Sequence, residues 1–300
     1  MASTPRKILV PTDFSTTADR AEKLAFTLAD RLSAELHLLH VRVILEDPHM
    51  AEEHQLEIER LRTFTDEATE VALAQAGQAG PHLKVETHLV RGISAPEAIA
   101  ETATEIDCDL IVMGTHGRRG IKHLLLGSVA ENVVRSAHIP VLTVRPDAKL
   151  PTAGLSRILV PYDFSEPSAI AVQTAAAWAA AFDAELTLIH VVEPVAYPEF
   201  YTINVVSDDV LAKLRDRSTE ALDRAASELL GDHPVDTEVL IGRAADTIVT
   251  EAESGSFDLV VMGTRGLSAL EHLVLGSAAE AVLRRCPVPL LTVGKAKSED

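Results

Sequence analysis

Residues 8–15 read Ile-Leu-Val-Pro-Thr-Asp-Phe-Ser, and residues 158–165 read Ile-Leu-Val-Pro-Tyr-Asp-Phe-Ser. The two stretches differ at one position and lie 150 residues apart. A short apolar run that ends at proline is typical of a buried strand, and the serine that follows is a good N-cap for a helix. A repeat period of this length corresponds to a whole domain. The chain is therefore predicted to contain the same domain twice.

The repeat continues along the chain. Asp109-Leu-Ile-Val-Met-Gly-Thr115 returns as Asp258-Leu-Val-Val-Met-Gly-Thr264, now 149 residues later. Between residues 113–144 and 262–293, 17 of 32 positions are identical, which excludes chance. Residues 147–156 contain a proline, a glycine and small polar side chains, a composition typical of a linker. We expect a first domain at residues 1–146 and a second at residues 157–300.

Strand-like and helix-like patterns alternate within each copy. In the first copy, strands are predicted at 7–10, 35–41, 83–90, 110–113 and 141–144, and helices at 16–32, 52–76, 96–105 and 128–136. In the second copy, helices are predicted at 167–181, 208–230, 244–253 and 278–285. This order indicates an α/β fold in which each domain is a five-stranded parallel sheet with helices on both faces.

Composition and charge exclude several classes of function. The chain has 300 residues and a formal net charge of −18. Such a surface repels phosphate backbones and anionic lipids, so we expect no nucleic-acid and no membrane partner. No signal-peptide core and no apolar run of membrane-spanning length is present, so a cytoplasmic location is expected. Cys108 and Cys286 are too few for a disulfide framework and are expected to be reduced thiols.

The carboxyl ends of two strands point to a ligand site. In an open parallel sheet, ligands bind where the strand order reverses. For the expected order 3-2-1-4-5, this place lies between the first and fourth strands. The first strand ends at Pro11, Thr12 and Asp13, and the fourth ends at Met113 and Gly114. The corresponding residues of the second copy are Pro161, Tyr162, Asp163, Met262 and Gly263.

A glycine-rich loop follows the fourth strand in both copies. Gly114-Thr-His-Gly117 is followed by nine residues and then by Gly127-Ser128, which open a helix. Glycines let the backbone pass close to a ligand. A helix N-terminus offers free N–H groups and a positive dipole end to an anion. The loop is predicted to cradle a phosphate, and Ser128 and Ser277 are expected to be the N-caps of their helices.

The pattern Gly-x2-Gly-x9-Gly-Ser, with Val-Pro-x-Asp-Phe-Ser at the first strand, resembles the ATP-binding universal stress proteins over nearly the whole chain. The resemblance implies two tandem Rossmann-like (adenine nucleotide alpha hydrolase-like) domains, each with one ATP site. In similar proteins the motif's glycines and serine hold the phosphates, the aspartate meets the ribose and the residue after the second strand's histidine contacts the adenine. The implied first site comprises Pro11, Thr12, Asp13, Val41, Met113, Gly114, His116, Gly117, Arg119, Gly127, Ser128 and Val129. The implied second site comprises Pro161, Tyr162, Asp163, Val191, Met262, Gly263, Arg265, Gly266, Gly276, Ser277 and Ala278.

Several alternatives stay open. ATP is the implied cofactor, and Mg²⁺ is allowed beside it. Asp13 and Asp163 could instead cap the following helix. His40 and His190 are expected to pack or to support the site. No second acidic residue recurs with Asp13, so we assign no catalytic residue, and no set of side chains has the spacing of metal ligands. A nucleotide-responsive stress module is the expected function; a slow ATPase or autokinase, and an interaction scaffold with structural nucleotide, are the alternatives.

The last strand of each domain indicates how the domains associate. Residues 141–144 and 290–293 would be sheet edges, and bare edges invite pairing. In similar proteins two such strands pair across a dimer axis. Here the two domains of one chain are expected to pair, and a homodimer is expected in addition. Residues 194–206 concentrate aromatic side chains and could form a lid, an interface or a packed loop.

Overall fold

The structure is a computed structural model that describes residues 4–43, 59–60, 63, 83–117, 127–152, 154–193, 208–264 and 275–294. The first domain contains β1 (Lys7–Pro11), α1 (Thr16–Leu32), β2 (Glu35–Val43), β3 (Val85–Gly92), α3 (Ala95–Glu105), β4 (Leu110–Gly114), α4 (Ser128–Ser136) and β5 (Val141–Val144). The second contains β6 (Arg157–Pro161), α5 (Glu166–Phe182), β7 (Glu185–Val192), α6 (Asp208–Leu230), β8 (Asp236–Ile241), α7 (Ala244–Ser254), β9 (Leu259–Gly263), α8 (Ser277–Arg285) and β10 (Leu290–Val293). Most of the helix expected at 52–76, and all of segment 194–206, lie outside the described residues.

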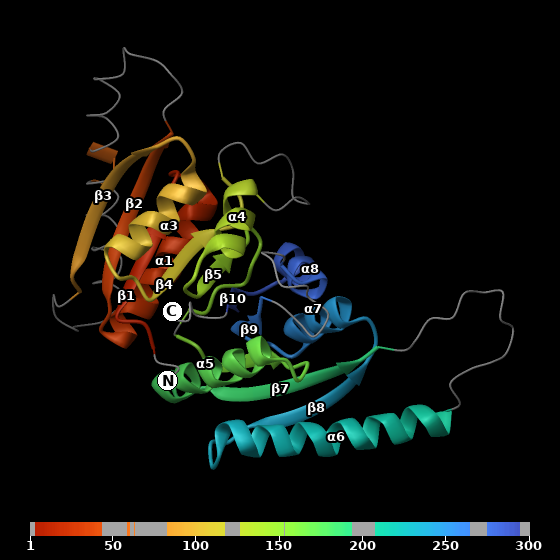
Figure 1. Ribbon diagram of the computed structural model, residues 1–300. Helices are drawn as coiled ribbons and strands as arrows, with labels where there is room; N and C mark the ends of the chain where they lie inside the picture. The colour runs from red at the N-terminus through yellow and green to blue at the C-terminus, as the bar shows by residue number, and fades with distance from the viewer. Residues whose placement is uncertain are drawn as a thin grey trace, which may run out of the picture.

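These strands form one continuous sheet in the order β3-β2-β1-β4-β5-β10-β9-β6-β7-β8 (Figure 1). Neighbours within each domain are parallel, and the predicted order 3-2-1-4-5 is confirmed in both. The domains meet where β5 and β10 pair antiparallel, with Leu142 opposite Leu291. The expected pairing of the last strands within one chain is therefore confirmed. A homodimer would have to use other surfaces.

Helices cover both faces of the sheet. One apolar cluster joins the sheet to α1, α5 and α6, and the other joins it to α3, α4, α7 and α8. Strand β1 shows the alternation that builds two cores: Ile8 and Val10 belong to the first cluster and Leu9 to the second. Successive residues of a strand point to opposite faces, and all three side chains are fully buried because helices cover both faces of the sheet.

The connection between the domains packs against both of them. Ala148 and Leu155 are buried. The guanidinium of Arg20 in α1 donates to the carbonyl of Ala148, and the backbone N–H of Lys149 donates to Pro287 O at 2.7 Å. The segment expected to be a linker is thus hydrogen-bonded to the first domain at one residue and to the second at the next.

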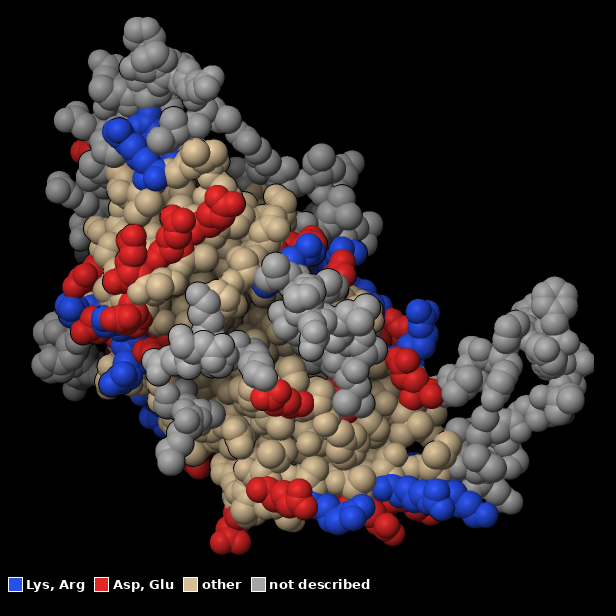
Figure 2. Space-filling model, viewed as in Figure 1, with Lys and Arg blue, Asp and Glu red and all other residues tan. Residues whose placement is uncertain are grey.

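Acidic side chains dominate part of the surface. Glu97, Glu101 and Glu105 are exposed and lie along α3. Figure 2 shows a row of acidic side chains in its upper part, whereas acidic and basic side chains alternate along its lower edge. Residues four apart lie on one side of a helix, so the three carboxylates reinforce one another. This face disfavours a polyanionic partner. Among the described helices, none has the length and apolarity needed to cross a bilayer.

Candidate functional site

A cavity of about 690 Å³ opens at the carboxyl ends of β1, β2 and β4, where the strand order reverses. All but one of the residues expected in the first site line it; the exception, Arg119, lies outside the described residues. The lining also includes residues that sequence reasoning did not place in the site: Ala18, Leu39, His40, Arg42, Val43, Ala95, Ile99, Thr115 and Ala130.

A second cavity of about 320 Å³ occupies the same place in the second domain. Nine residues expected in the second site line it, while Arg265 and Gly266 lie outside the described residues. Sequence reasoning expected His190 to pack or to support the site, and it missed Ser168, Ile189, Glu193, Ala244, Ile248 and Ala279. Glu193 stands at the position of Val43 in the repeat, and neither residue was expected in its site.

A tight turn holds the aspartate at the end of the first strand. Asp13 Oδ1 accepts a hydrogen bond from Ser15 N at 3.1 Å, and Ser15 Oγ accepts one from Ala18 N at 3.2 Å. Ser15 is therefore the N-cap of α1. Ser165 caps α5 in the same way, and Asp163 accepts from its N–H at 3.1 Å. The alternative that the aspartates cap these helices is wrong.

The next residue of each turn has a left-handed backbone. Phe14 has φ 59° and Phe164 has φ 64°, a conformation that costs a non-glycine residue about 1 kcal/mol or more. The ring of Phe14 lies 4.7 Å from that of His40, and the ring of Phe164 lies 4.8 Å from that of His190. These contacts help to hold the strained turn in both copies.

The recurrent histidines fasten the same turn to the second strand of each domain. His40 Nδ1 lies 2.8 Å from Thr12 O, and His190 Nδ1 lies 2.8 Å from Tyr162 O. Because a carbonyl oxygen only accepts, each Nδ1 carries a proton and donates it. The expected supporting role of these histidines is confirmed by this hydrogen bond.

Two of the motif glycines are explained by packing. A Cβ at Gly114 would lie 3.0 Å from backbone atoms of Thr17 in α1, and a Cβ at Gly263 would lie 2.8 Å from the backbone of Pro167 in α5. Gly117 differs, because a Cβ there would overlap the carboxylate of Asp13. The loop after β4 thus passes directly over the aspartate at the end of β1.

A glycine immediately precedes each helix that follows a glycine-rich loop. Gly127 is the N-cap of α4 and Gly276 that of α8, so the expectation that Ser128 and Ser277 are N-caps is wrong. The N–H of Gly127 donates to Thr115 O at 2.8 Å, and that of Gly276 to Thr264 O at 2.9 Å. No side chain caps either helix. The first-turn N–H groups at positions 128–130 have no intrahelical acceptor and lie at the cavity wall.

The second strand presents backbone groups to the cavity. Thr12 N donates to Leu39 O at 2.8 Å, so Leu39 turns its backbone groups toward β1. In a parallel sheet, alternate residues face the same neighbour. Val41 therefore directs its N–H and C=O past the end of β1. Val191 occupies the same position, because Tyr162 N donates to Ile189 O at 2.8 Å.

The two cavities differ in charge. Asp13 and Arg42 line the first, and Asp163 and Glu193 line the second. The carboxylate of Glu193 accepts a hydrogen bond at 2.5 Å from Ala244 N, the first residue of α7. Anions are less favoured beside two carboxylates than beside one carboxylate and one guanidinium.

The thiols take no part in either cavity. Cys108 and Cys286 are buried and unpaired, and burial raises the pKa of each to about 12. Both remain protonated at neutral pH and are not nucleophiles there.

Comparison with known proteins agrees with this architecture. Residues 4–145 and 154–294 each match the model of the universal stress protein family. A universal stress protein of Methanocaldococcus jannaschii is 36% identical over 146 residues, which are 48% of this chain and 84% of that protein. One of Mycobacterium tuberculosis is 31% identical over 228 residues, 75% of this chain and 74% of that protein. A universal stress protein structure from Archaeoglobus fulgidus shares the fold, with a TM-score of 0.68 at 23% identity, and covers 97% of this chain and 98% of its own. The chain therefore belongs to the universal stress protein family and carries the family's domain twice.

Proposed function

We propose that each domain binds one ATP and that the protein is a stress-response module whose state depends on nucleotide occupancy. The observation that carries the proposal is the first cavity, which is lined both by the N-terminus of α4, where no side chain caps the helix, and by the turn that holds Asp13. Its volume of about 690 Å³ lies within the range of small-molecule sites.

The walls of this cavity complement the three parts of ATP. The first-turn N–H groups of α4 can donate to phosphate oxygens. The carboxylate of Asp13 can accept from the ribose hydroxyls, and the backbone groups of Val41 can pair with the edge of adenine. Mg²⁺ would accompany the triphosphate as its counter-ion, because oxygen ligands from phosphate and water suit it.

Binding is favoured over turnover by the small number of acidic groups. Phosphoryl transfer requires a positioned water or acceptor, a group that orients it and bound metal. Asp13 is the one carboxylate among the described residues of the first cavity, and its Oδ1 already accepts from Ser15 N. Any hydrolysis at this site is therefore expected to be slow.

Matched charge variants test the proposal in each domain separately. Val129 in α4 and Ala278 in α8 line the two cavities at equivalent positions. Val129→Glu and Ala278→Glu place a negative charge in the first helical turn, where it favours the helix but repels a phosphate. Val129→Gln and Ala278→Gln are the neutral controls.

Titration calorimetry should show two ATP per wild-type chain. Each glutamate variant should lose one of the two sites, with an affinity at least about tenfold weaker than in its glutamine control. The absence of ATP binding by the wild type, or equal affinities in the glutamate and glutamine variants, would overturn the assignment. Chromatography of the recovered nucleotide separates binding from hydrolysis, since ADP would indicate turnover.

A further inference from the structure

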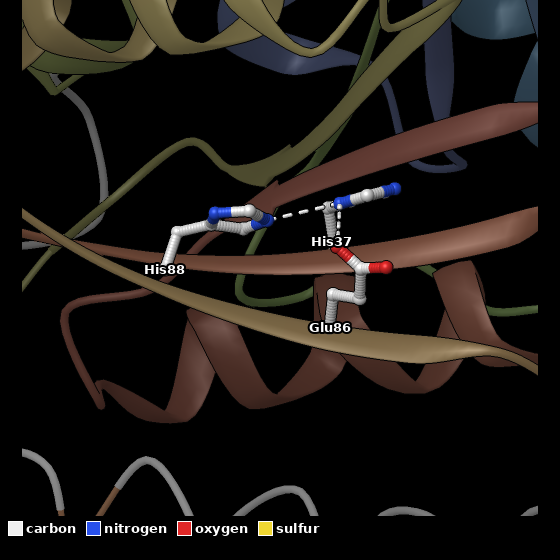
Figure 3. A group of neighbouring side chains, drawn as sticks. All are labelled: His37, Glu86 and His88. Carbon is white, nitrogen blue, oxygen red and sulfur yellow. Dashed lines mark hydrogen bonds and ion pairs between the residues drawn. The ribbon is translucent and has the colours of Figure 1, made fainter.

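Two histidines and a glutamate meet on the first domain, away from its cavity. His37 lies near the start of β2, and Glu86 and His88 lie near the start of β3 (Figure 3). None of the three lines either cavity. The strands run parallel, so this cluster sits at the end of β2 and β3 opposite to the cavity.

The sheet register brings the three side chains to one face. His37 pairs with Glu86, and Leu39 pairs with His88. His37 Nδ1 lies 2.9 Å from His88 Nε2 and 3.8 Å from Glu86 Oε2. One nitrogen or oxygen atom from each residue falls within 4.8 Å of the other two. These atoms can converge on a single ion.

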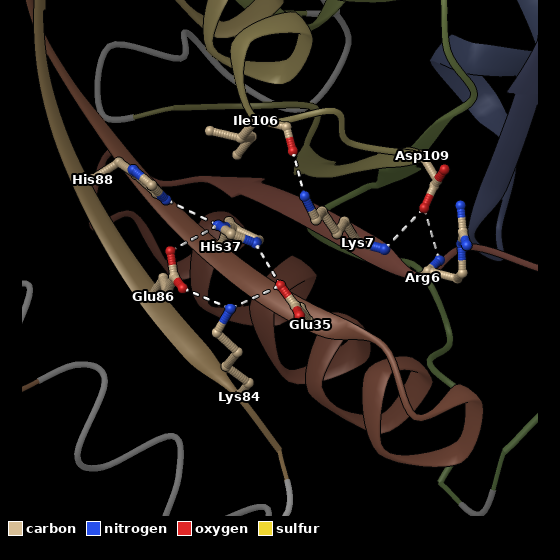
Figure 4. Close-up of polar contacts among 9 residues, drawn as sticks. All are labelled: Arg6, Lys7, Glu35, His37, Lys84, Glu86, His88, Ile106 and Asp109. Carbon is tan, nitrogen blue, oxygen red and sulfur yellow. Dashed lines mark hydrogen bonds and ion pairs between the residues drawn. The ribbon is translucent and has the colours of Figure 1, made fainter.

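Neighbouring charges orient the potential ligands (Figure 4). The ammonium of Lys84 lies 2.9 Å from Glu86 Oε1, which leaves Oε2 toward His37. Glu35 Oε2 lies 3.6 Å from His37 Nε2. A carboxylate beside the outer nitrogen favours a proton there and a lone pair on Nδ1, as in many metal sites. The carboxylates of Glu35 and Glu86 flank the ammonium of Lys84, and the ammonium of Lys7 also acts on Glu35.

The side chain of His37 is buried, with 5% exposure, so its ring is held in place by its surroundings. The side chain of Glu86 is 44% exposed, and His88 is partly exposed. An ion could therefore reach the cluster from solvent and find one fixed ligand and two adjustable ones.

We propose that His37, Glu86 and His88 bind one divalent transition-metal ion of the zinc class, with water completing the coordination. Imidazole and carboxylate ligands suit zinc, copper, nickel and cobalt, whereas magnesium and calcium prefer oxygen alone. Tetrahedral zinc with bonds of about 2.0–2.1 Å places its nitrogen ligands roughly 3.3 Å apart. The two histidine nitrogens, now 2.9 Å apart, would separate by about 0.4 Å. The proton that one of them donates to the other would be released to solvent as the ion binds.

The second domain lacks this cluster. Thr187, Asp236 and Glu238 occupy the positions of His37, Glu86 and His88 in the register of β7 and β8. One ion per chain is therefore expected. Strand β3 is the edge of the sheet, and the ion would tie this edge strand to β2.

Zinc titration of the full chain in a non-chelating buffer tests the site. Glu86→Gln and His88→Ala remove ligands that are not fully buried, and His138→Ala removes an exposed histidine outside the cluster as the control. One zinc equivalent should bind the wild type and the control alike, and at least about tenfold more weakly to both ligand variants. Zinc should raise Tm in the wild type and not in His88→Ala.

Cobalt supplies an independent readout, because its visible spectrum reports nitrogen ligation and coordination number. The wild type and His138→Ala should give the same spectrum, and His88→Ala should not. Equal zinc affinity in the wild type and both ligand variants would overturn the proposal. An equal loss in His138→Ala would also overturn it, since it would indicate scattered binding to surface histidines. Circular dichroism establishes that each variant is folded.

Discussion

The two domains share the frame of their cavities and differ at the rim. In both domains, an aspartate turn follows the first strand, and the serine after it is the N-cap of the next helix. The phenylalanine of the turn has a left-handed backbone, and a histidine of the second strand donates a hydrogen bond to the turn. We call the last residues of the second strand and its end the rim of the cavity. The rim contains Arg42 and Val43 in the first domain, and Val192 and Glu193 in the second. Duplication has kept the residues that shape the backbone, while the residues that set the local charge have diverged.

This difference predicts unequal affinities. The first cavity is about 690 Å³ and has Asp13 and Arg42 among its lining residues, whereas the second is about 320 Å³ and has Asp163 and Glu193. Both volume and charge favour a bound triphosphate in the first domain. We expect the first domain to fill at lower ATP concentration than the second.

The largest effect on stability is expected at one buried position of α1, the first helix of the first domain, whose counterpart in the second domain is α5. Glu22 in α1 is 1% exposed, and Val172 stands at the same place in α5. Burial, aided by Asp19, raises the pKa of Glu22 from 4.5 to about 9. Between these values the unfolded chain releases a proton that the folded chain keeps, so stability falls as pH rises.

Glu22→Val should remove this dependence and make the first domain resemble the second. Its gain in unfolding free energy should grow from pH 5 to pH 8.5, by up to about 1.4 kcal/mol per pH unit. Denaturant unfolding at a series of pH values measures it. Asp30→Asn, which removes an exposed carboxylate from the same helix, should leave the wild-type slope in place. A slope that survives in Glu22→Val would contradict the assignment.

A negative charge added at the rim of the first cavity and one removed from the rim of the second should change ATP affinity in opposite directions. Val43→Glu should weaken binding in the first domain, and Glu193→Gln, which keeps an acceptor for Ala244 N, should strengthen it in the second. A charge about 10 Å from a phosphate contributes about 1–2 kcal/mol, or roughly tenfold.

Calorimetry on these two variants can use Ala278→Glu or Val129→Glu as a background to report one site at a time. Val43→Gln is the neutral control for the first domain. Unchanged affinity in both rim variants would show that charge at the rim is not what separates the two sites.

The smallest change in stability is expected from the serines that cap α1 and α5. Ser15→Ala and Ser165→Ala should each cost about 1 kcal/mol of stability. The cost should be greater for Ser165, whose Oγ also donates to Asp163 Oδ1 at 2.5 Å, while the additional contact of Ser15 Oγ is to His116 O at 3.4 Å. Urea unfolding compares the two, and the Ser→Thr variants should retain most of the stability. Equal losses would imply that the extra bond contributes nothing.

Local patterns were sufficient to predict most elements. Strand β5 at 141–144 and helix α6 at 208–230 have the predicted bounds, because apolar periodicity and the residues that end an element are local features. The place of the two cavities also followed from the sequence, since strand order alone locates the switch point.

Long-range contacts explain what was missed. Ser128 was expected to cap α4, but the N–H of Gly127 bonds back to Thr115 and makes the glycine the cap. Glu193 acts on a helix that starts 51 residues later. His37 and His88 are also 51 residues apart, and only the register of two strands brings their rings together.

The antiparallel contact of β5 with β10 has a consequence for biosynthesis. The residues that pair there, such as Leu142 and Leu291, are far apart in the sequence, so the ribosome adds the second long after the first. At ribosomal rates of about 5–20 residues per second, the first domain waits about 7–30 s before its final strand is covered. Throughout this interval a nascent chain exposes an apolar strand edge to other nascent chains on the same message. Translation speed across the second domain thus sets how long the protein is open to misassembly.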